Sequence, residues 1–354
     1  MPDPVIISVD AMGGDIGAAV SVAGVDLALE RIGPSREVRF LLHGDERAIA
    51  AELARHPRAK AACEIRHTDQ VIAGDEKPAV ALRRGKGSSL WNAVEAIRDG
   101  QAHAAVSGGN TGALMAISKL ILRMAGGLER PAIVASWPTA RGITSLLDVG
   151  ANLESDAAQL VEFAIMGEAF HRAVHARSGA RPSVGLLNVG SEDVKGHEEV
   201  REAHRLLRDT GLELNFFGFV EGNDIARGTV DVIVTDGFTG NVALKTGEGL
   251  ARFFADTLLE SLRSSPLAMA GAVLAQGAIR DMRRRLTPPG GGPLLGLKGT
   301  VVKCHGGADA AGFADGIKIA VDLASSGYAD QIARNLERLA AALKADAAPK
   351  EAVT

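Results

Sequence analysis

The sequence repeats one pattern along most of its length: a short run rich in Val and Ile, a loop that contains glycine, and a longer stretch with apolar residues at helical spacing. Short, continuous apolar runs are typical of strands covered on both faces, and their alternation with helices favours a parallel sheet. Candidate strands are residues 5–9, 38–42, 64–67, 102–107, 132–137, 144–149, 183–189, 214–220, 230–235 and 300–303. We therefore expect an α/β fold with a mostly parallel sheet in an α/β/α sandwich.

Helices are predicted from apolar residues that recur every 3.6 positions. One such face carries Leu160, Ala164 and His171, and Ser155 is the candidate N-cap of this helix. Pro78 suits the first turn of another helix, because its missing N–H has no intrahelical partner there in any case.

A second helical series extends from residue 250 to residue 285, and the Pro- and Gly-rich segment 288–293 cannot continue it. We expect one α/β domain over residues 1–343, with a helical arm inserted at about 250–287 that projects from it. The Ala-rich remainder, residues 344–354, is expected to be a flexible tail.

Composition narrows the class of protein. With 354 residues, 46% of them hydrophobic, the chain can bury a large core without disulfides or metals. Its two cysteines, Cys63 and Cys304, have no CxxC spacing, which fits a reducing cytoplasm. The start of the chain has no secretion-signal pattern, and the most apolar later stretch, 267–279, is shorter than the ~20 residues of a membrane span. A net charge of −4 and the lack of a basic stripe with interleaved aromatic residues argue against a nucleic-acid partner.

Polar and glycine-rich loops follow several of the expected strands, where open parallel sheets bind their ligands. The first loop follows strand 5–9 and contains Asp10, Gly13, Gly14 and Asp15. Its glycines allow a tight turn, and its carboxylates can orient hydrogen-bond donors. The alternative is an ordinary turn in which Asp15 caps a helix.

The second loop follows strand 102–107 and leads into a helix. Free backbone N–H groups and the helix dipole would make it an anion site, whereas a plain glycine-rich turn is the alternative. Its candidate residues are Ser107, Gly108, Gly109, Asn110, Thr111 and Gly112.

The third and fourth loops follow strands 230–235 and 183–189. The fourth, 190–197, presents Lys195, which could neutralise a phosphate or donate to a leaving thiolate; the alternative is a solvated surface lysine. The third resembles the second in placing polar and glycine residues before a helix. Its candidate residues are Asp236, Gly237, Gly240, Asn241 and Lys245.

Two other features carry charge or a potential nucleophile. A basic run could face an acidic carrier or a phosphopantetheine phosphate, although each of its residues taken singly fits a solvated surface charge. The run consists of Lys77, Arg83, Arg84 and Lys86. Cys304 precedes a histidine, but adjacency in sequence does not give the facing geometry of a catalytic dyad, and no GxSxG elbow occurs.

Taken together and in order, these loops resemble the bacterial phosphate acyltransferases of the PlsX type, over nearly the whole chain. The matching segments are 9–15, 76–78, 86, 88–89, 106–115, 148–152, 184–190, 195–196, 220–222 and 236–242. The sequence departs from the family at Ile16, Gly17 and Ala18, where the family has His-Ala-Pro, so no role for a histidine is implied there. A milder departure is segment 306–309, which has less serine than the family pattern.

The resemblance implies an enzyme that converts acyl-acyl carrier protein and inorganic phosphate into acyl phosphate and free carrier protein, for phosphatidic acid synthesis. It also implies a fold similar to that of phosphotransacetylases and of isocitrate and isopropylmalate dehydrogenases. No cofactor or metal is implied. A homodimer is expected in the cytoplasm, with peripheral contact to the inner face of the membrane and a downstream glycerol-3-phosphate acyltransferase.

For this reaction the catalytic residues that we expect are Lys195, Asn241 and Asn110. Phosphate itself attacks, so proximity is the main catalytic device. The asparagines, Thr111 and nearby amides would bind the phosphate and the thioester oxygen, and Lys195 would balance charge. Asn152, in matching segment 148–152, joins the loop residues named above in the expected binding site.

The arm offers a surface for a carrier protein or an anionic membrane. Lys86 from the basic run is a further candidate for contact with that partner. Leu267, Met269, Val273 and Leu274 are apolar, and the basic residues Arg280, Arg283, Arg284 and Arg285 follow them. A helix that packs in a dimer and has a solvated basic end is the alternative.

Three rival functions remain open on the sequence: a phosphotransacetylase that uses coenzyme A, a dinucleotide-dependent dehydrogenase, and a noncatalytic membrane scaffold. The missing GxGxxG loop argues against the dehydrogenase, and the polar loops argue against the scaffold.

Overall fold

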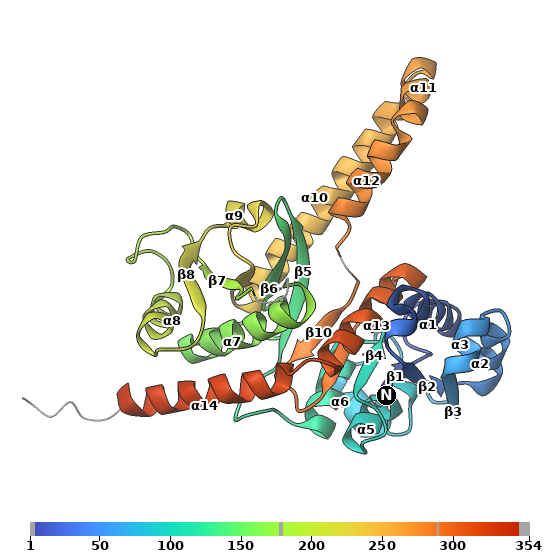
Figure 1. Cartoon of the computed structure of the whole chain (residues 1–354), viewed down its shortest axis with the longest axis horizontal. Coiled ribbons are helices and arrows are strands. Elements are labelled where there is room, and N and C mark those ends of the chain that lie inside the picture. Colours follow the sequence, from blue (N-terminus) through green and yellow to red (C-terminus); the bar gives the residue numbers. More distant parts are fainter. Residues whose placement is uncertain (1–3, 177–179, 289, 347–354) are drawn as a thin grey trace, which may run out of the picture.

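The computed structural model describes residues 4–176, 180–288 and 290–346, and its strands form one sheet of eleven (Figure 1). The strand order is β3-β2-β1-β4-β11-β10-β5-β6-β9-β7-β8. The strands are β1 (Val5–Asp10), β2 (Val38–Gly44), β3 (Cys63–His67), β4 (Ala104–Ser107), β5 (Ala132–Thr139), β6 (Gly142–Leu147), β7 (Ser183–Leu187), β8 (Asn215–Val220), β9 (Val232–Val234), β10 (Gly292–Leu295) and β11 (Thr300–Lys303). All ten expected strands are present; β10 was not expected, because its first residues belong to the Pro- and Gly-rich segment.

Helices follow most of the strands, as the alternating pattern predicts. They are α1 (Ala18–Ile32), the 3-10 turn η1 (Gly33–Ser35), α2 (Glu46–Leu53), α3 (Pro57–Ala62), α4 (Pro78–Arg84), α5 (Ser89–Arg98), α6 (Thr111–Leu122), α7 (Ala157–Val174), α8 (Glu198–Asp209), α9 (Gly222–Arg227), α10 (Gly237–Arg263), α11 (Pro266–Leu274), α12 (Gln276–Leu286), α13 (Ala310–Ala324) and α14 (Tyr328–Asp346). Pro78 occupies the first turn of α4 as predicted. The expected cap Ser155 is wrong: Asp156 caps α7, because its carboxylate accepts from the Gln159 amide while the Gln159 side chain accepts from the Asp156 amide.

Alternate residues of the central strands face opposite helical layers, which makes the molecule an α/β/α sandwich. Val232 and Val234 of β9 pack in the core that includes α1, α7 and α13, whereas Ile233 packs in a separate core with α9 and α10. A third cluster joins Val301 to residues of α5 and α6 on that second face. The α/β/α fold expected from the hydrophobic pattern is therefore confirmed.

The strand direction reverses in the middle of the sheet. β1, β4 and β11 run parallel to one another, and β6, β9, β7 and β8 form a second parallel group. Between the groups, β10 is antiparallel to both β11 and β5, and β5 is antiparallel to β6. The two parallel groups consequently point in opposite directions, and their carboxyl ends lie at opposite edges of the sheet.

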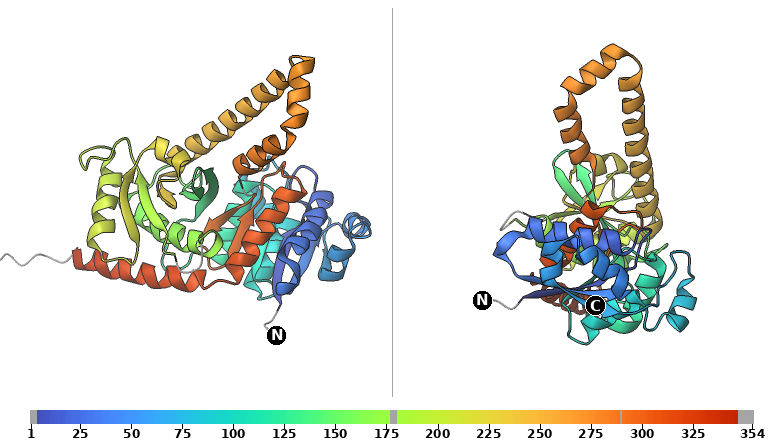
Figure 2. Two further views of the ribbon diagram at one scale, coloured as in Figure 1. Left: turned by 45° about the horizontal axis from the view of Figure 1, so that its top comes forward. Right: turned by 90° about the vertical axis from the view of Figure 1, so that its right-hand side faces the viewer.

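Helices α10, α11 and α12 form an arm that projects away from both halves of the sheet (Figures 1 and 2). The expected arm, 250–287, falls within these helices, although α10 already begins at Gly237. At the other end of the chain, helix α14 continues through residues 344–346, which were expected to belong to the tail. The rest of that expected tail, 347–354, lies outside the described residues.

Candidate active site

The carboxyl ends of β1, β4 and β11 bring three loops together. We call loops 10–15, 107–112 and 303–309 the first loop cluster. Ser107 of β4 stands beside Asp10 of β1 on one side and beside Lys303 of β11 on the other. The first loop cluster thus contains two loops that were predicted from the sequence and a third, 303–309, that was not.

Asp10 is buried at the centre of the first loop cluster. Its Oδ2 accepts a hydrogen bond of 2.7 Å from the Ser107 hydroxyl, whose oxygen accepts in turn from the Gly109 amide at 3.0 Å. Burial raises the pKa of the Asp10 carboxyl, against the lowering effect of its hydrogen bonds. A side chain at Gly13 would collide with this carboxylate and with the Gly109 amide, so the close approach of the first two loops requires glycine.

Asn110 is the N-cap of α6 rather than a free donor. Its Oδ1 accepts from the Ala113 amide at 2.9 Å, and its Nδ2 donates to the carbonyls of Gly74 and Glu76 at 2.9 and 2.8 Å. The expectation that its side chain points at a ligand is not met in this structure, because all of these groups belong to the protein. The amides of Thr111 and Gly112 are what α6 offers a ligand, because they lie in its first turn and have no intrahelical carbonyl to bind.

Lys303 is the residue of this site that the sequence reasoning missed. Its Nζ donates to the Gly108 carbonyl at 3.2 Å and also contacts the Cys304 carbonyl. Burial lowers the pKa of the Lys303 amine, while the nearby acids Asp10 and Asp15 act to raise it. A lysine at the end of a predicted strand was the signal available, but only strand pairing places it beside Ser107.

Asp15 and Gly14 connect the first loop with segment 303–309. The Asp15 amide donates to the Gly306 carbonyl at 2.9 Å, and Gly14 has a φ of 93°, which favours glycine. Asp15 does not cap a helix, since Gly17 occupies the N-cap of α1. The Asp15 side chain is exposed at the margin of the first loop cluster.

The buried carboxylate Asp148 organises a second group of loops. We call loops 148–152, 188–197 and 236–241, at the carboxyl ends of β6, β7 and β9, the second loop cluster. Asp148 accepts hydrogen bonds from the amides of Ile133, Ala151 and Asn152 and from the Asn152 side chain, at 2.7–3.1 Å. Burial raises its pKa, and these hydrogen bonds act in the opposite direction. Asn152 thus holds the loop, and it also donates to the Pro131 carbonyl at 2.8 Å.

The third expected loop is built onto this network. The Gly237 amide donates to the Asn152 carbonyl at 2.7 Å, and a side chain at Gly240 would collide with the Asp148 carbonyl. Asp236 caps α10 through the Thr239 amide, and Asn241 donates to the Val149 carbonyl at 3.0 Å. Lys245 is exposed and pairs with Glu248 at 2.8 Å.

Lys195 lies in the exposed loop after β7, next in the sheet to β9. It forms an ion pair of 2.8 Å with Glu192, whose hydrogen bond raises the pKa of the Lys195 amine. Its carbonyl accepts from Asn188, and a side chain at Gly190 would meet the lysine itself. Lys195 and Asn241 therefore belong to the same edge of the sheet.

Within one chain, the two loop clusters lie at different edges of the sheet and do not meet. Because the strand direction reverses at β10 and β5, the carboxyl ends of β4 and β9 occupy opposite edges. The expected sheet was mostly parallel, and its antiparallel strands fall between the two loop clusters, so Asn110 and Asn241 of one chain lie at different edges of the sheet. Each loop cluster therefore contains only part of the binding site that was expected from the sequence.

The expected contact residues are exposed. Leu267 is 83% exposed and Leu274 90%, on α11 at the end of the arm, and Lys86 is exposed on the main body. Arg280 and Arg283 are also exposed, and Arg284 pairs with Asp281 at 3.2 Å. Among the described residues, no helix is both long and apolar enough to cross a membrane.

Neither metal ligation nor a nucleophilic cysteine emerges from the geometry. In the ranges that the structure describes, no three His, Cys, Asp or Glu side chains gather closely enough to hold a metal. Cys304 is buried, as expected, and burial raises its pKa to about 12. Such a thiol stays protonated and inert at neutral pH.

Comparison with known proteins gives the family context for these loops. A family model described as "Fatty acid synthesis protein" matches residues 5–331. A phosphate acyltransferase from Caulobacter vibrioides is 66% identical over 343 residues, which cover 96% of this chain and 94% of that protein. Another from Phenylobacterium zucineum is 58% identical over 352 residues, covering 99% of both.

Solved structures show the fold. Phosphotransacetylases from Staphylococcus aureus and Streptococcus pyogenes each superpose with a TM-score of 0.61, at 15% and 16% identity. The first match covers 91% of this chain and 94% of the other, and the second covers 92% and 95%. The phosphotransacetylase-like fold expected from the sequence is confirmed.

Proposed function

The chain belongs to the fatty acid synthesis protein family, whose matched members are phosphate acyltransferases, and from that premise we propose that it transfers a fatty acyl group from acyl carrier protein to inorganic phosphate. It is accordingly an enzyme of the transferase class. The observation that carries the proposal is the first loop cluster: a half-buried lysine beside a glycine loop that leads into a helix N-terminus. Oriented amides and a cation at such a terminus favour an oxyanion.

The reaction needs no protein nucleophile. An oxygen of hydrogen phosphate attacks the thioester carbon, a C–O bond forms, and the C–S bond breaks. The proton of the hydrogen phosphate ends on the departing thiol, so acyl phosphate and free carrier protein are the products. Holding the two reactants together is then the main task of the protein.

In the first loop cluster we assign phosphate to the free amides of Thr111 and Gly112 and to the Lys303 amine. Asp10 supports this arrangement through Ser107, whose hydroxyl positions the Gly109 amide. Asn110 is a positioning residue, because its side chain fixes the start of α6 and the neighbouring loop 73–76. Losing one well-aimed donor to a developing oxyanion typically costs ~2.7–4 kcal/mol.

Lys195 and Asn241 keep the catalytic roles expected from the sequence, but they act from a second copy of the chain. One chain presents the two loop clusters at opposite edges of its sheet, so a two-fold dimer that sets one copy's second cluster against its partner's first would complete the site. Exposed apolar residues on α10, Phe253 and Phe254, offer an apolar surface for such a partner.

The arm suits a product that is destined for membrane lipid. Helix α11, which carries the exposed Leu267 and Leu274, lies at the far end of the arm (Figure 1), and the arginines of α12 follow it, which fits peripheral contact with the anionic inner face of the cell membrane. A downstream glycerol-3-phosphate acyltransferase could then take up acyl phosphate there, for phosphatidic acid synthesis. The proposed location is the cytoplasm with such contact.

The test is to incubate purified protein with a long-chain acyl carrier protein substrate, with and without phosphate, and to trap acyl phosphate with hydroxylamine. We expect hydroxamate only when phosphate is present. Acyl-coenzyme A is the parallel donor, because the phosphotransacetylase-like fold makes that cofactor the second candidate. Faster turnover of acyl-coenzyme A would assign the phosphotransacetylase activity instead, and no hydroxamate from either donor would contradict both.

A further inference from the structure

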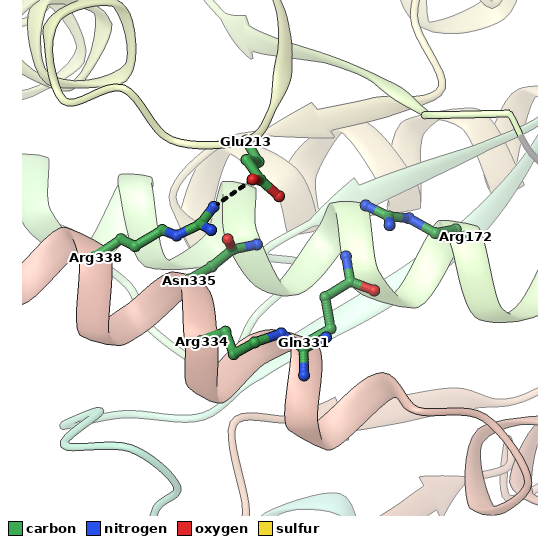
Figure 3. A pocket seen from close by; sticks show the side chains of 6 residues that line it. All are labelled: Arg172, Glu213, Gln331, Arg334, Asn335 and Arg338. Atoms are coloured by element: carbon green, nitrogen blue, oxygen red, sulfur yellow. Dashed lines mark ion pairs between the residues drawn. The ribbon is translucent and has the colours of Figure 1, made fainter.

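A polar pocket lies between α7 and α14, apart from both loop clusters (Figure 3). It encloses about 90 Å³. The residues that line it are Arg172 of α7, Glu213 from the segment before β8, and Gln331, Arg334, Asn335 and Arg338 of α14. Three separate parts of the chain thus converge on one small cavity.

Cationic groups outnumber the carboxylates that contact them. Arg172 pairs with the buried Glu168, which also accepts from Gln331 Nε2 at 2.8 Å. Arg338 pairs with Glu213 at 2.9 Å. Arg334 makes no ion pair with the side chains that the structure describes, and Glu213 is shared with Arg181 at 4.0 Å, so guanidinium groups outnumber the two carboxylates.

One buried donor and one side-chain amide at the pocket have no hydrogen-bond partner in the described parts of the chain. The Asn335 side chain, which lines the cavity on a residue only 4% exposed, makes no hydrogen bond with the described residues. The Nε of Arg172 is buried without an acceptor. Figure 3 shows the Asn335 amide among the arginine and glutamine side chains of the cavity. Buried donors without partners in a native protein call for a bound ligand or water.

We propose that this pocket binds one inorganic phosphate ion, at a site distinct from the reacting phosphate. The excess positive charge and the unpartnered donors select an oxyanion, and guanidinium groups match tetrahedral oxyanions well. At ~30 Å³ per water molecule the cavity has room for about three waters. That is enough for a small inorganic anion and too little for a nucleotide or a lipid.

Equilibrium dialysis against labelled inorganic phosphate tests the site. Arg334→Gln removes the unpaired charge from an exposed position of α14, so the fold should persist. Arg227→Gln is the matched control, because Arg227 is an exposed arginine of α9 outside the pocket. We expect the parent and the control to bind one more phosphate per chain than Arg334→Gln, or to bind it roughly tenfold more tightly, the usual effect of one charged hydrogen bond.

The rate of acyl phosphate formation distinguishes this pocket from the proposed active site. The pocket proposal does not rest on the proposed function. Arg334→Gln should form acyl phosphate at the parent's rate, since the pocket is remote from the loop clusters. Equal phosphate binding by all three proteins would overturn the proposal. So would joint loss of binding and turnover in Arg334→Gln, because the measured phosphate would then be the reacting one.

Discussion

At the scale of single residues, Asp10 affects both the stability of the fold and the proposed active site. Its carboxyl is fully buried, and burial raises its pKa above the ordinary value of 3.8. This carboxyl therefore favours the folded state most below pH 3.8, and that contribution is lost as the pH rises through its folded-state pKa. At neutral pH an ionised Asp10 is a cost to the fold.

Asp10→Asn should remove that cost. Asparagine keeps an oxygen for the Ser107 hydroxyl and places its amide nitrogen at the carboxylate oxygen that has no partner among the described residues. We expect urea unfolding to show a variant at least as stable as the parent at pH 7, with a difference that shrinks as the pH falls towards 3.8. Turnover should fall, because Asp10 supports the positive charge of Lys303.

Asp15→Asn is the control for this prediction, since Asp15 lies exposed in the same loop. Its stability should stay within about 0.5 kcal/mol of the parent. A pH-independent loss of stability in Asp10→Asn would show that the carboxylate contributes by shape alone.

The sequence predicted the glycine and asparagine loops but not how each side chain is used. Glycine and polar residues after a strand are a local signal, so Asp10 and Ser107 could be found. Lys303 could not, because nothing local connects it with Ser107, 196 positions earlier in numbering; their contact depends on β11 pairing with β4. That Asn110 caps α6 could not be predicted either, since a capping side chain and a ligand-binding one look alike in sequence.

At the scale of elements, the arm is where sequence and structure agree most closely. Apolar residues at helical spacing followed by arginines predicted a projecting arm at 250–287, and α10 to α12 provide it. Periodicity alone could not say what covers its apolar residues. Strand β10 escaped prediction because four residues after a glycine run give too short a pattern to register.

Leu274→Glu should weaken binding to vesicles that contain phosphatidylglycerol. Leu274 is 90% exposed on α11, and inserting a full leucine side chain into an apolar phase is worth ~1.5–3 kcal/mol. Losing that term, with an added negative charge, should reduce the fraction that sediments with vesicles by roughly tenfold or more. Leu120→Glu, which is 56% exposed on α6, makes the same change on the main body and should sediment like the parent. Equal sedimentation of both variants would show that Leu274 does not bind the vesicles, and the arm would then contact a different partner.

At the scale of the whole molecule, the reversal of strand direction decides how the site is assembled. Hydrophobic runs identify strands but not their polarity, and three antiparallel pairs around β10 and β5 are enough to separate loops that a parallel sheet would unite. The sequence therefore predicted loops at the carboxyl ends of strands but not at which edge of the sheet each loop lies. The grouping that we propose instead spans two copies of the chain.

Complementation between two inactive variants tests this shared site. Lys303→Met damages the first loop cluster and Lys195→Met the second, so each homodimer should lose most of its acyl phosphate formation. If one complete site takes Lys303 from one copy and Lys195 from the other, a mixed dimer contains one site with both lesions and one with neither. Unfolding and refolding an equal mixture makes half of the dimers mixed, so about a quarter of the parent activity should return. If both lysines of a site came from one chain, every site would carry a lesion and mixing would restore nothing. Recovery that depends on refolding the two variants together, and is absent when they are refolded apart, is therefore the result that a site shared between copies requires.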